Sequence, residues 1–187
     1  MRSLLLCSML ACLGCDGGGG TPPGTDGGGM PPPAGETGRM VGMTAAHNAV
    51  RARVSASIPA VTWSAELAAI AQAYSESLAS GACNLTHSSN GYGENLAMFG
   101  GTTAAPQDVV EAWASEESCY SYGTFMGTDA CDNTCVQRSG GCGHFTQLVW
   151  ADTRRIGCGV ARCADGRTEI WTCNYDPPGN FLGRAPY

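Results

Sequence analysis

Eight cysteines between residues 83 and 173 are the feature that most restricts how this 187-residue chain can fold. Eleven cysteines occur in all, and the other three lie within the first 15 residues. An even set of cysteines in an exported domain is typical of a disulfide framework, so we predict four bridges. The eight residues are Cys83, Cys119, Cys131, Cys135, Cys142, Cys158, Cys163 and Cys173.

The first 15 residues have the composition of an export signal. One arginine precedes an apolar run from Leu4 to Leu13 and small residues that end at Cys15, and this run is too short to span a bilayer as a helix. Its end resembles a bacterial lipobox, in which cleavage exposes a cysteine that is then acylated. Cys15 fits best, with Cys12 as the alternative residue and secretion without a lipid as the alternative route. We expect a signal peptide over residues 1–15 and an extracytoplasmic protein, either lipid-anchored to a bacterial membrane or secreted.

A Gly/Pro-rich segment over residues 16–39 follows the signal and has nothing with which to form a core. It predicts a disordered tether, and residues 40–187 are then one folded domain, because 43% hydrophobic content in a chain of this length supports one core. The formal charge of −6, with ten arginines and no lysine, argues against nucleic acid or an anionic membrane surface as a partner. We expect a monomer that meets a membrane only through its lipid anchor.

Three stretches have helical periodicity. Thr44 can cap a first helix in which His47 lies on the apolar stripe, so His47 is expected in the core rather than among ligands. Ser64 can cap a second helix that Gly81 ends. Pro106 suits the first turn of a third helix that continues to Tyr120.

The third helix carries an acid on its apolar side. Glu116 lies three residues after Trp113 and seven after Val109, a spacing that points its carboxylate toward the core. Burial of a carboxylate costs several kcal/mol unless the group is paired or protonated. Glu117 is only slightly worse placed, so periodicity alone leaves both glutamates open.

The C-terminal third is strand-like and contains a hairpin signal. The Asp-Gly step at residues 165–166 predicts a two-residue turn, which pairs residues whose numbers sum to 331. Cys158 then lies opposite Cys173, within disulfide reach. Cys163 projects from the other face of the strand, because strand side chains alternate. Its candidate partner is Cys83, at the end of the second helix.

The other four cysteines are paired by proximity in the sequence alone, as Cys119–Cys131 and Cys135–Cys142, and their pairing stays open. A zinc site built from the strings CDNTC and CGH is the alternative. Its ligand spacing is loose and its compartment oxidising, so disulfides are favoured.

Six strings, in order, resemble the CAP superfamily of cysteine-rich secretory proteins, antigen 5 and plant pathogenesis-related proteins, with the plant class nearest. They are HNAVRARV, CNLTHSSNGYGENLA, WASEESCY, GCGHFTQLVW, IGCGVARC and CNYDPPGNFLGRAPY. The resemblance runs from Thr44 to Tyr187. It implies an α+β fold, a disulfide-stabilised three-layer α-β-α sandwich with a central antiparallel sheet, and it supports Cys83–Cys163 and Cys158–Cys173 alongside strand parity.

The last of these strings implies one further possibility. Plant relatives with this ending are reported to release it as a signalling peptide. Here we expect Pro177 and Pro178 to end the strand and the tail to pack on the domain.

The resemblance also implies a site, since the family has a cavity tetrad of two histidines and two glutamates. Its Trp-x-x-Glu pattern selects Glu116 over Glu117, and His47 matches a block outside the tetrad. The four matching positions are His87, Glu94, Glu116 and His144.

Two imidazoles that face two carboxylates allow three kinds of chemistry. They can hold a divalent metal such as Zn²⁺ through His87 and His144, although no cofactor is required. They can act as general acid and base, or they can form a polar network that neutralises its own charges. No serine or cysteine nucleophile with a convincing histidine partner is visible.

We therefore expect a binding module rather than an enzyme. Its expected partner is a lipid, a sterol or another small ligand, or a cell-surface protein. A metal-dependent, protease-like hydrolase that uses the tetrad is the alternative.

Overall fold

A four-stranded sheet forms the centre of the described domain, with strand order β1-β3-β4-β2. The strands are β1 (Thr62–Trp63), β2 (Gly93–Gly100), β3 (Arg155–Arg162) and β4 (Thr168–Asp176). Strands β2, β4 and β3 are antiparallel neighbours, whereas the two-residue β1 pairs parallel with β3, so the sheet is mixed rather than wholly antiparallel. The computed structural model describes residues 35–101, 103–126, 131–132 and 141–187, and the predicted signal peptide over 1–15, with Cys12 and Cys15, and residues 16–34 of the predicted tether lie outside the described residues.

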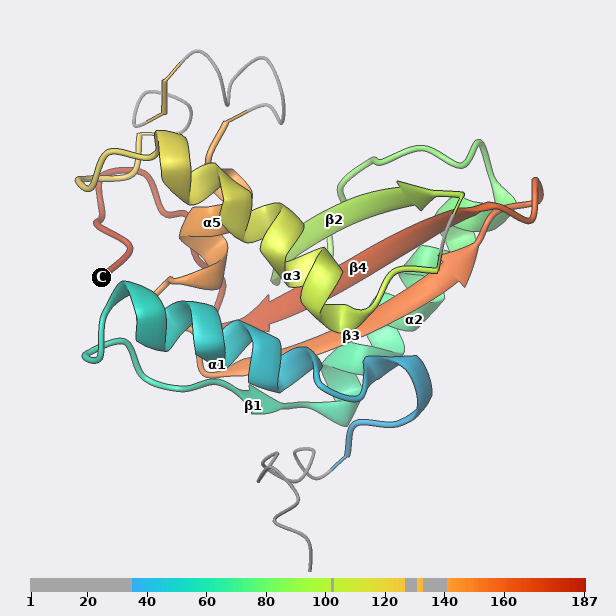
Figure 1. The fold of residues 1–187 in the computed structure, drawn as a ribbon, viewed down its shortest axis with the longest axis horizontal. Coiled ribbons are helices and arrows are strands. Elements are labelled where there is room, and N and C mark those ends of the chain that lie inside the picture. Colours follow the sequence, from blue (N-terminus) through green and yellow to red (C-terminus); the bar gives the residue numbers. More distant parts are fainter. Residues whose placement is uncertain (1–34, 102, 127–130, 133–140) are drawn as a thin grey trace, which may run out of the picture. The chain divides into compact units, whose positions relative to one another are not determined.

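Helices cover both faces of this sheet, which confirms the predicted three-layer α+β sandwich (Figure 1). Helix α2 (Ala65–Ser80) packs on one face. Helices α1 (Met43–Val54), α3 (Pro106–Ala114) and α5 (Gly143–Leu148) lie on the other face, where their apolar side chains share one core with Trp171 and Tyr175 of β4.

Two glycines of β3 let α2 approach the sheet closely. A Cβ on Gly157 would lie 2.2 Å from the backbone nitrogen of Ala68, and one on Gly159 would lie 2.4 Å from the Cα of Gln72. Both distances are too short for any side chain, so α2 rests directly on the strand backbone. Ser75 of α2 adds a hydrogen bond to the Gly159 carbonyl at 3.2 Å.

The first two predicted helices form, but Gly42 and not Thr44 caps the first, since Thr44 lies inside it, and the third helix ends early. Ser64 accepts a hydrogen bond from the Leu67 amide at 3.3 Å, as an N-cap should. Helix α3 ends at Ala114, and a 3₁₀ helix η2 (Ser115–Cys119) replaces the predicted continuation to Tyr120. Serine hydroxyls in this stretch bond backbone carbonyls three residues earlier, which competes with regular helix.

The predicted hairpin register is confirmed. Cys158 pairs directly with Cys173, and the two form a disulfide with Cα atoms 4.1 Å apart. Cys83 and Cys163 form a second disulfide beside Ala79 of α2. Because Cys158 packs in the core on the opposite side of the sheet, strand parity assigned both cysteines to the correct faces.

The pairing by sequence proximity is wrong. Cys131 is bonded to Cys142, which excludes both Cys119–Cys131 and Cys135–Cys142. An isolated antiparallel bridge pairs Cys131 with Tyr120 just after η2, yet Cys131 is bonded to Cys142 and not to the neighbouring Cys119. Cys119 is also disulfide-bonded, and Cys135 lies outside the described residues.

The folded part begins before the predicted boundary at Met40. Gly35 packs on the Trp63 indole, Glu36 accepts hydrogen bonds from the Gly42 and Thr44 amides, and Arg39 forms an ion pair with Glu169 at 2.6 Å. These contacts extend the domain to Gly35, upstream of the sequence boundary.

The C-terminal tail packs on the domain, as predicted. The Phe125 amide donates to the Arg184 carbonyl at 2.7 Å, and the Ala151 amide donates to the Pro186 carbonyl at 2.6 Å. The guanidinium of Arg184 also lies over the rings of Trp150 and Phe181. Both hydrogen bonds and ring contacts therefore hold the tail in place.

Candidate functional site

His144 lies in the first turn of α5 and is paired with Glu116 of η2. Its Nδ1 donates to Glu116 Oε1 at 2.7 Å. The other oxygen, Oε2, accepts from the amides of His144 and Phe145, both at 3.0 Å. One buried carboxylate therefore orients the imidazole and also satisfies two amides at the start of α5.

The structure settles the choice between the two glutamates. The Glu116 side chain is 2% exposed, whereas Glu117 is 41% exposed and pairs with Arg53 at 2.8 Å. The change from α3 to η2 turns the chain so that Glu116 faces α5. Helical periodicity in the sequence assumes a regular α-helix here, and on that assumption it could not show which of the two glutamates is buried.

His87 and Glu94 form a second pair, on the loop before β2 and on β2 itself. His87 Nδ1 donates to Glu94 Oε1 at 2.8 Å. The same carboxylate accepts from the Ser88 amide at 2.9 Å and from the Ser88 hydroxyl at 2.6 Å. The carboxylate is buried, while the His87 side chain is 64% exposed.

The pKa values of this second pair respond to the contact. The hydrogen bond that His87 donates to Glu94 raises the pKa of His87, against the opposing effect of partial burial. Burial opposes ionisation of Glu94, but the hydrogen bonds from His87 and Ser88 outweigh it and lower the pKa of this carboxyl. The ionic form of the pair is therefore stabilised.

The four residues of the expected tetrad thus form two hydrogen-bonded pairs, His87 with Glu94 and His144 with Glu116. Glu94 lies near Tyr74 of α2, whose pKa it helps to raise, whereas Glu116 lies against α5. The described hydrogen bonds of the His87 and His144 side chains stay within their own pairs.

His47 belongs to the core, as the sequence predicted. Its Nδ1 lies 2.8 Å from the Met43 carbonyl, so this nitrogen carries the proton, and its Nε2 accepts from the Tyr175 hydroxyl at 3.0 Å. Burial lowers the pKa of His47 to about 4. The ring is neutral at pH 7 and is shielded from solvent.

Sequence reasoning missed two residues that support the site. Asn95 donates to the His144 carbonyl at 3.0 Å and to the Tyr175 hydroxyl at 3.1 Å, which ties α5 to the core. Ser88 holds the Glu94 carboxylate through its amide and its hydroxyl. The sequence contained a signal for Asn95: it follows Glu94 directly in a strand, so its side chain must lie on the other face of the sheet from that of Glu94.

Both imidazoles have the arrangement that metal-ligating histidines use. Each donates Nδ1–H to a carboxylate, which fixes the tautomer that leaves Nε2 with a lone pair. In the described part of the chain, no group of three or more His, Cys, Asp or Glu is placed to hold a metal ion. Each pair thus leaves one imidazole Nε2 without a described hydrogen bond, and the described contacts hold His87 and His144 in separate pairs.

The fold and these pairs define a class: a disulfide-linked α-β-α sandwich that carries two histidine–glutamate pairs. Residues 44–175 match the family model described as "CAP: Cysteine-rich secretory protein family". The chain therefore belongs to the CAP family, as the sequence strings predicted. Membership of a secretory family supports the expected location outside the cytoplasm.

Plant proteins are among its relatives. Pathogenesis-related protein 1C of Nicotiana tabacum is 42% identical over 142 residues, which cover 76% of this chain and 77% of that protein. Pathogenesis-related leaf protein 4 of Solanum lycopersicum is 46% identical over 145 residues, with coverage of 76% and 80%. These matches confirm the likeness to the plant class.

Solved structures agree on the fold. BmVAL-1 has 31% identity and a TM-score of 0.54, and the match covers 70% of this chain and 65% of that one. NaASP2, solved with Zn²⁺, has 25% identity and a TM-score of 0.62, with coverage of 78% and 82%. Within the described residues, no helix has the length and apolar character needed to cross a membrane.

Proposed function

We propose that this protein is an exported CAP module that binds a small ligand of the lipid or sterol class and is held at a cell surface by a lipid on Cys15. Family likeness supports the ligand class, and the export signal supports the location. A binding role is favoured over hydrolysis by one observation, the state of the two carboxylates.

All four carboxylate oxygens of the pairs already accept hydrogen bonds from the protein. The Glu94 oxygens accept hydrogen bonds from the His87 ring and from the amide and hydroxyl of Ser88. The Glu116 oxygens accept from the His144 ring and from the two amides at the start of α5. A general base must direct a lone pair at a water. Each glutamate already uses three of the roughly four acceptor sites of a carboxylate to hold its loop or helix in place, which leaves little capacity for such a water.

The imidazoles remain available for ligation. His87 and His144 would hold a divalent ion through Nε2, and such an ion would supply positive charge for an oxygen of the ligand. The relative NaASP2 was solved with Zn²⁺, which supports this ion as the one to test.

A zinc titration tests the ion. Zinc bound only by the folded protein should raise the melting temperature at pH 7.5 by mass action. The gain should vanish below about pH 6, because protonated imidazoles do not ligate. His144→Ala should abolish the gain, while His47→Ala should lower stability and keep the zinc response. An unchanged response in His144→Ala removes the metal from the proposal.

Energy transfer from tryptophan to the fluorescent sterol dehydroergosterol tests the ligand class directly. Saturable transfer supports a binding module. Absence of transfer, together with zinc-dependent cleavage of casein that Glu94→Gln abolishes, would establish the hydrolase instead. Mass spectrometry of the mature N-terminus tests the anchor, and an unacylated terminus or one that starts beyond Cys15 contradicts it.

A further inference from the structure

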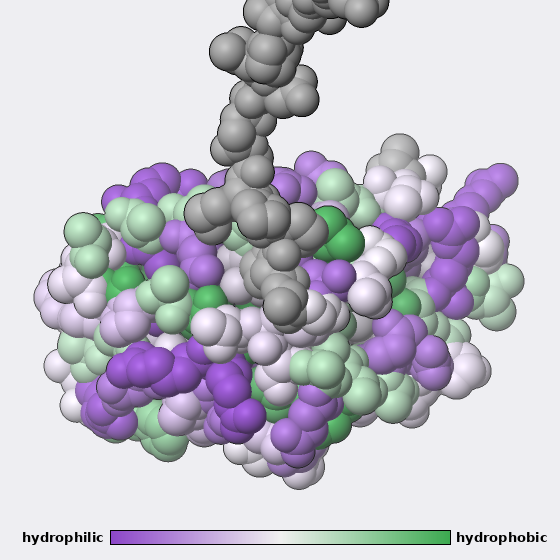
Figure 2. Space-filling view, turned by 90° about the horizontal axis from the view of Figure 1, so that it is seen from below, coloured by the Kyte–Doolittle hydropathy of each residue, from purple (hydrophilic) through white to green (hydrophobic). Residues whose placement is uncertain are grey.

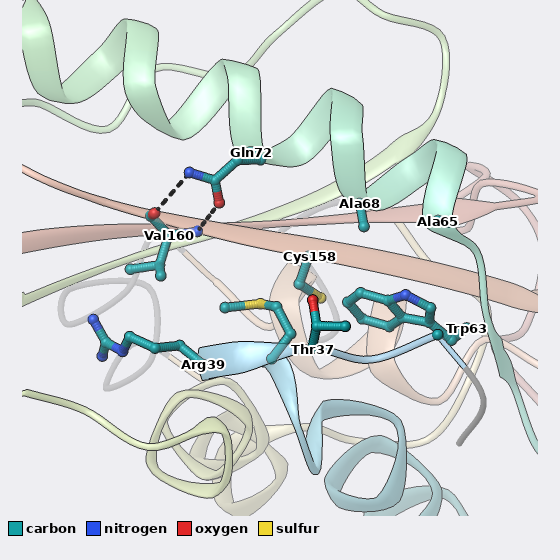
Figure 3. A pocket seen from close by; sticks show the side chains of 10 residues that line it. Thr37, Arg39, Trp63, Ala65, Ala68, Gln72, Cys158 and Val160 are labelled. Carbon is teal, nitrogen blue, oxygen red and sulfur yellow. Dashed lines mark hydrogen bonds between the residues drawn. The ribbon is translucent and has the colours of Figure 1, made fainter. Parts of the chain in front are cut away.

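A cavity of about 430 Å³ lies away from both histidine–glutamate pairs, none of whose residues line it. It is formed by residues 35–40, β1, α2 and β3 (Figure 3). The neighbouring face, seen in Figure 2, shows hydrophobic residues in small separate groups among hydrophilic ones over the described surface.

Small side chains and engaged polar groups keep the cavity open. Ala65 and Ala68 give the α2 wall only methyl groups. The Gln72 amide cannot fill the space, because it donates to the Val160 carbonyl at 3.0 Å and accepts from the Val160 amide at 3.0 Å. The wall is consequently shallow and rigid.

One end of the cavity is aromatic. Trp63 is partly exposed, whereas Trp113, Trp150 and Trp171 are at most 2% exposed and belong to the core. In Figure 3, Trp63 and Arg39 lie at opposite ends of the row of lining side chains, with Thr37 and Cys158 between them. A flat ring placed at this end would gain stacking with the indole beyond simple burial.

The other end carries surplus positive charge. Arg39 binds Glu169 through its two terminal guanidinium nitrogens, at 2.6 and 2.9 Å, and also donates to the Ala104 carbonyl at 2.8 Å. Arg162 binds the same carboxylate at 2.7 Å. Two cations thus share one anion. The Arg39 and Arg162 side chains are 37% and 51% exposed, so the excess charge can attract an anion from solvent.

Two further acids lie near the lining, because Glu76 also accepts a hydrogen bond from the Gln72 amide at 2.9 Å. Glu36 adjoins the lining segment, but its carboxylate accepts from the Gly42 and Thr44 amides at the start of α1, where the helix dipole compensates its charge. The Thr37 hydroxyl makes no hydrogen bond to any described residue, which leaves a donor beside the apolar floor.

We infer that this cavity binds a small aromatic acid, with the ring against Trp63 and the acidic group toward Arg39. This goes beyond the proposed function, because the site is separate from the histidine–glutamate pairs and takes a different ligand class. A rigid ring suits a shallow, rigid slot better than an alkyl chain, which loses more conformational freedom on binding.

The probe is 2-naphthoate, titrated into the full chain while tryptophan fluorescence is followed. Saturable quenching is expected. The neutral isostere naphthalene-2-carboxamide should bind about threefold to tenfold more weakly than 2-naphthoate at low salt. This gap in affinity should close at high salt, because salt screens the exposed arginines. Arg39→Gln should erase the gap. Arg53→Gln, which changes an exposed arginine outside the lining, should keep it.

Filling the slot supplies the second test. Ala68→Leu places a larger side chain in the cavity and should weaken 2-naphthoate binding at least tenfold, while Ala69→Leu, at an exposed position of the same helix, should not. The inference is overturned by equal binding to the Ala68→Leu protein, by tighter binding of decanoate than of 2-naphthoate, or by binding that appears only after residues 1–34 are removed. None of these results bears on sterol transfer or the zinc response.

Discussion

Acidification should destabilise the protein through His47. The ring is fully buried, donates from Nδ1 to the Met43 carbonyl and accepts at Nε2 from Tyr175. A second proton on Nε2 would remove that acceptor and place a cation near Arg51, itself buried. The folded state therefore resists protonation, while the unfolded chain does not.

The size of the effect follows from the two pKa values. The pKa of His47 falls from 6.5 to about 4 on folding. Because the unfolded chain binds the proton first, stability falls as pH falls from 6.5 toward 4, by about 3 kcal/mol over the whole range and about 2 kcal/mol between pH 7 and 5. The raised pKa of His87 acts in the opposite direction, since its contribution is fully present below pH 6.5, but that side chain is exposed and its effect is small.

Urea unfolding of the oxidised protein at pH 7, 6 and 5 measures this slope. His47→Gln keeps an amide in the pocket without a titrating group, so its stability should be lower at pH 7 and should vary much less with pH. His87→Gln is the control and should retain the slope. A wild-type protein whose stability is flat from pH 7 to 5, or a His47→Gln protein with the full slope, would refute the assignment to His47.

Two further changes should destabilise the fold in measurable ways. The buried Arg51 guanidinium donates to the backbone carbonyls of Pro59, Leu148, Trp150 and Thr153, so Arg51→Met leaves these carbonyls without that donor and should cost about 3–5 kcal/mol in urea unfolding. Arg53→Met, in an exposed pair, should cost less than about 1 kcal/mol. Gly159→Ala pushes a methyl group into α2 and should destabilise the protein by about 2 kcal/mol or more, which lowers the melting temperature by several degrees. Gly100→Ala is the control and should be nearly neutral, because open space surrounds Gly100. Equal shifts of the melting temperature in the two variants would contradict close packing of α2.

Sequence patterns that act over a few residues, such as turn signals, strand alternation and helical periodicity, predicted the local structure correctly in two places. The Asp-Gly turn set the β3–β4 register and hence Cys158–Cys173, because side chains in a strand alternate with period two. Helical periodicity placed His47 in the core for a similar reason. The same periodicity failed beyond Ala114, where serine hydroxyls compete for backbone carbonyls and the helix tightens.

Features that depend on distant segments could not be read from the sequence. Arg39 lies in a stretch whose composition is that of a linker, yet its partner Glu169 is 130 residues away. The cavity beside Arg39 was invisible for the same reason. The Cys131–Cys142 bridge likewise depends on how the chain returns from η2 to α5, which sequence proximity does not encode.

The disulfides help to explain how the loop before β2 and the start of α5 hold ordered histidine–glutamate pairs. The Cys83–Cys163 disulfide fixes the chain after α2, just before the loop that carries His87. The Cys131–Cys142 disulfide fixes Cys142, which is the N-cap of α5 and lies just before His144. Loops closed by such bridges lose less entropy when they order, since the unfolded chain is already constrained. Each imidazole therefore reaches its carboxylate at little further entropic cost, and the hydrogen bond of the pair then fixes the orientation of the ring.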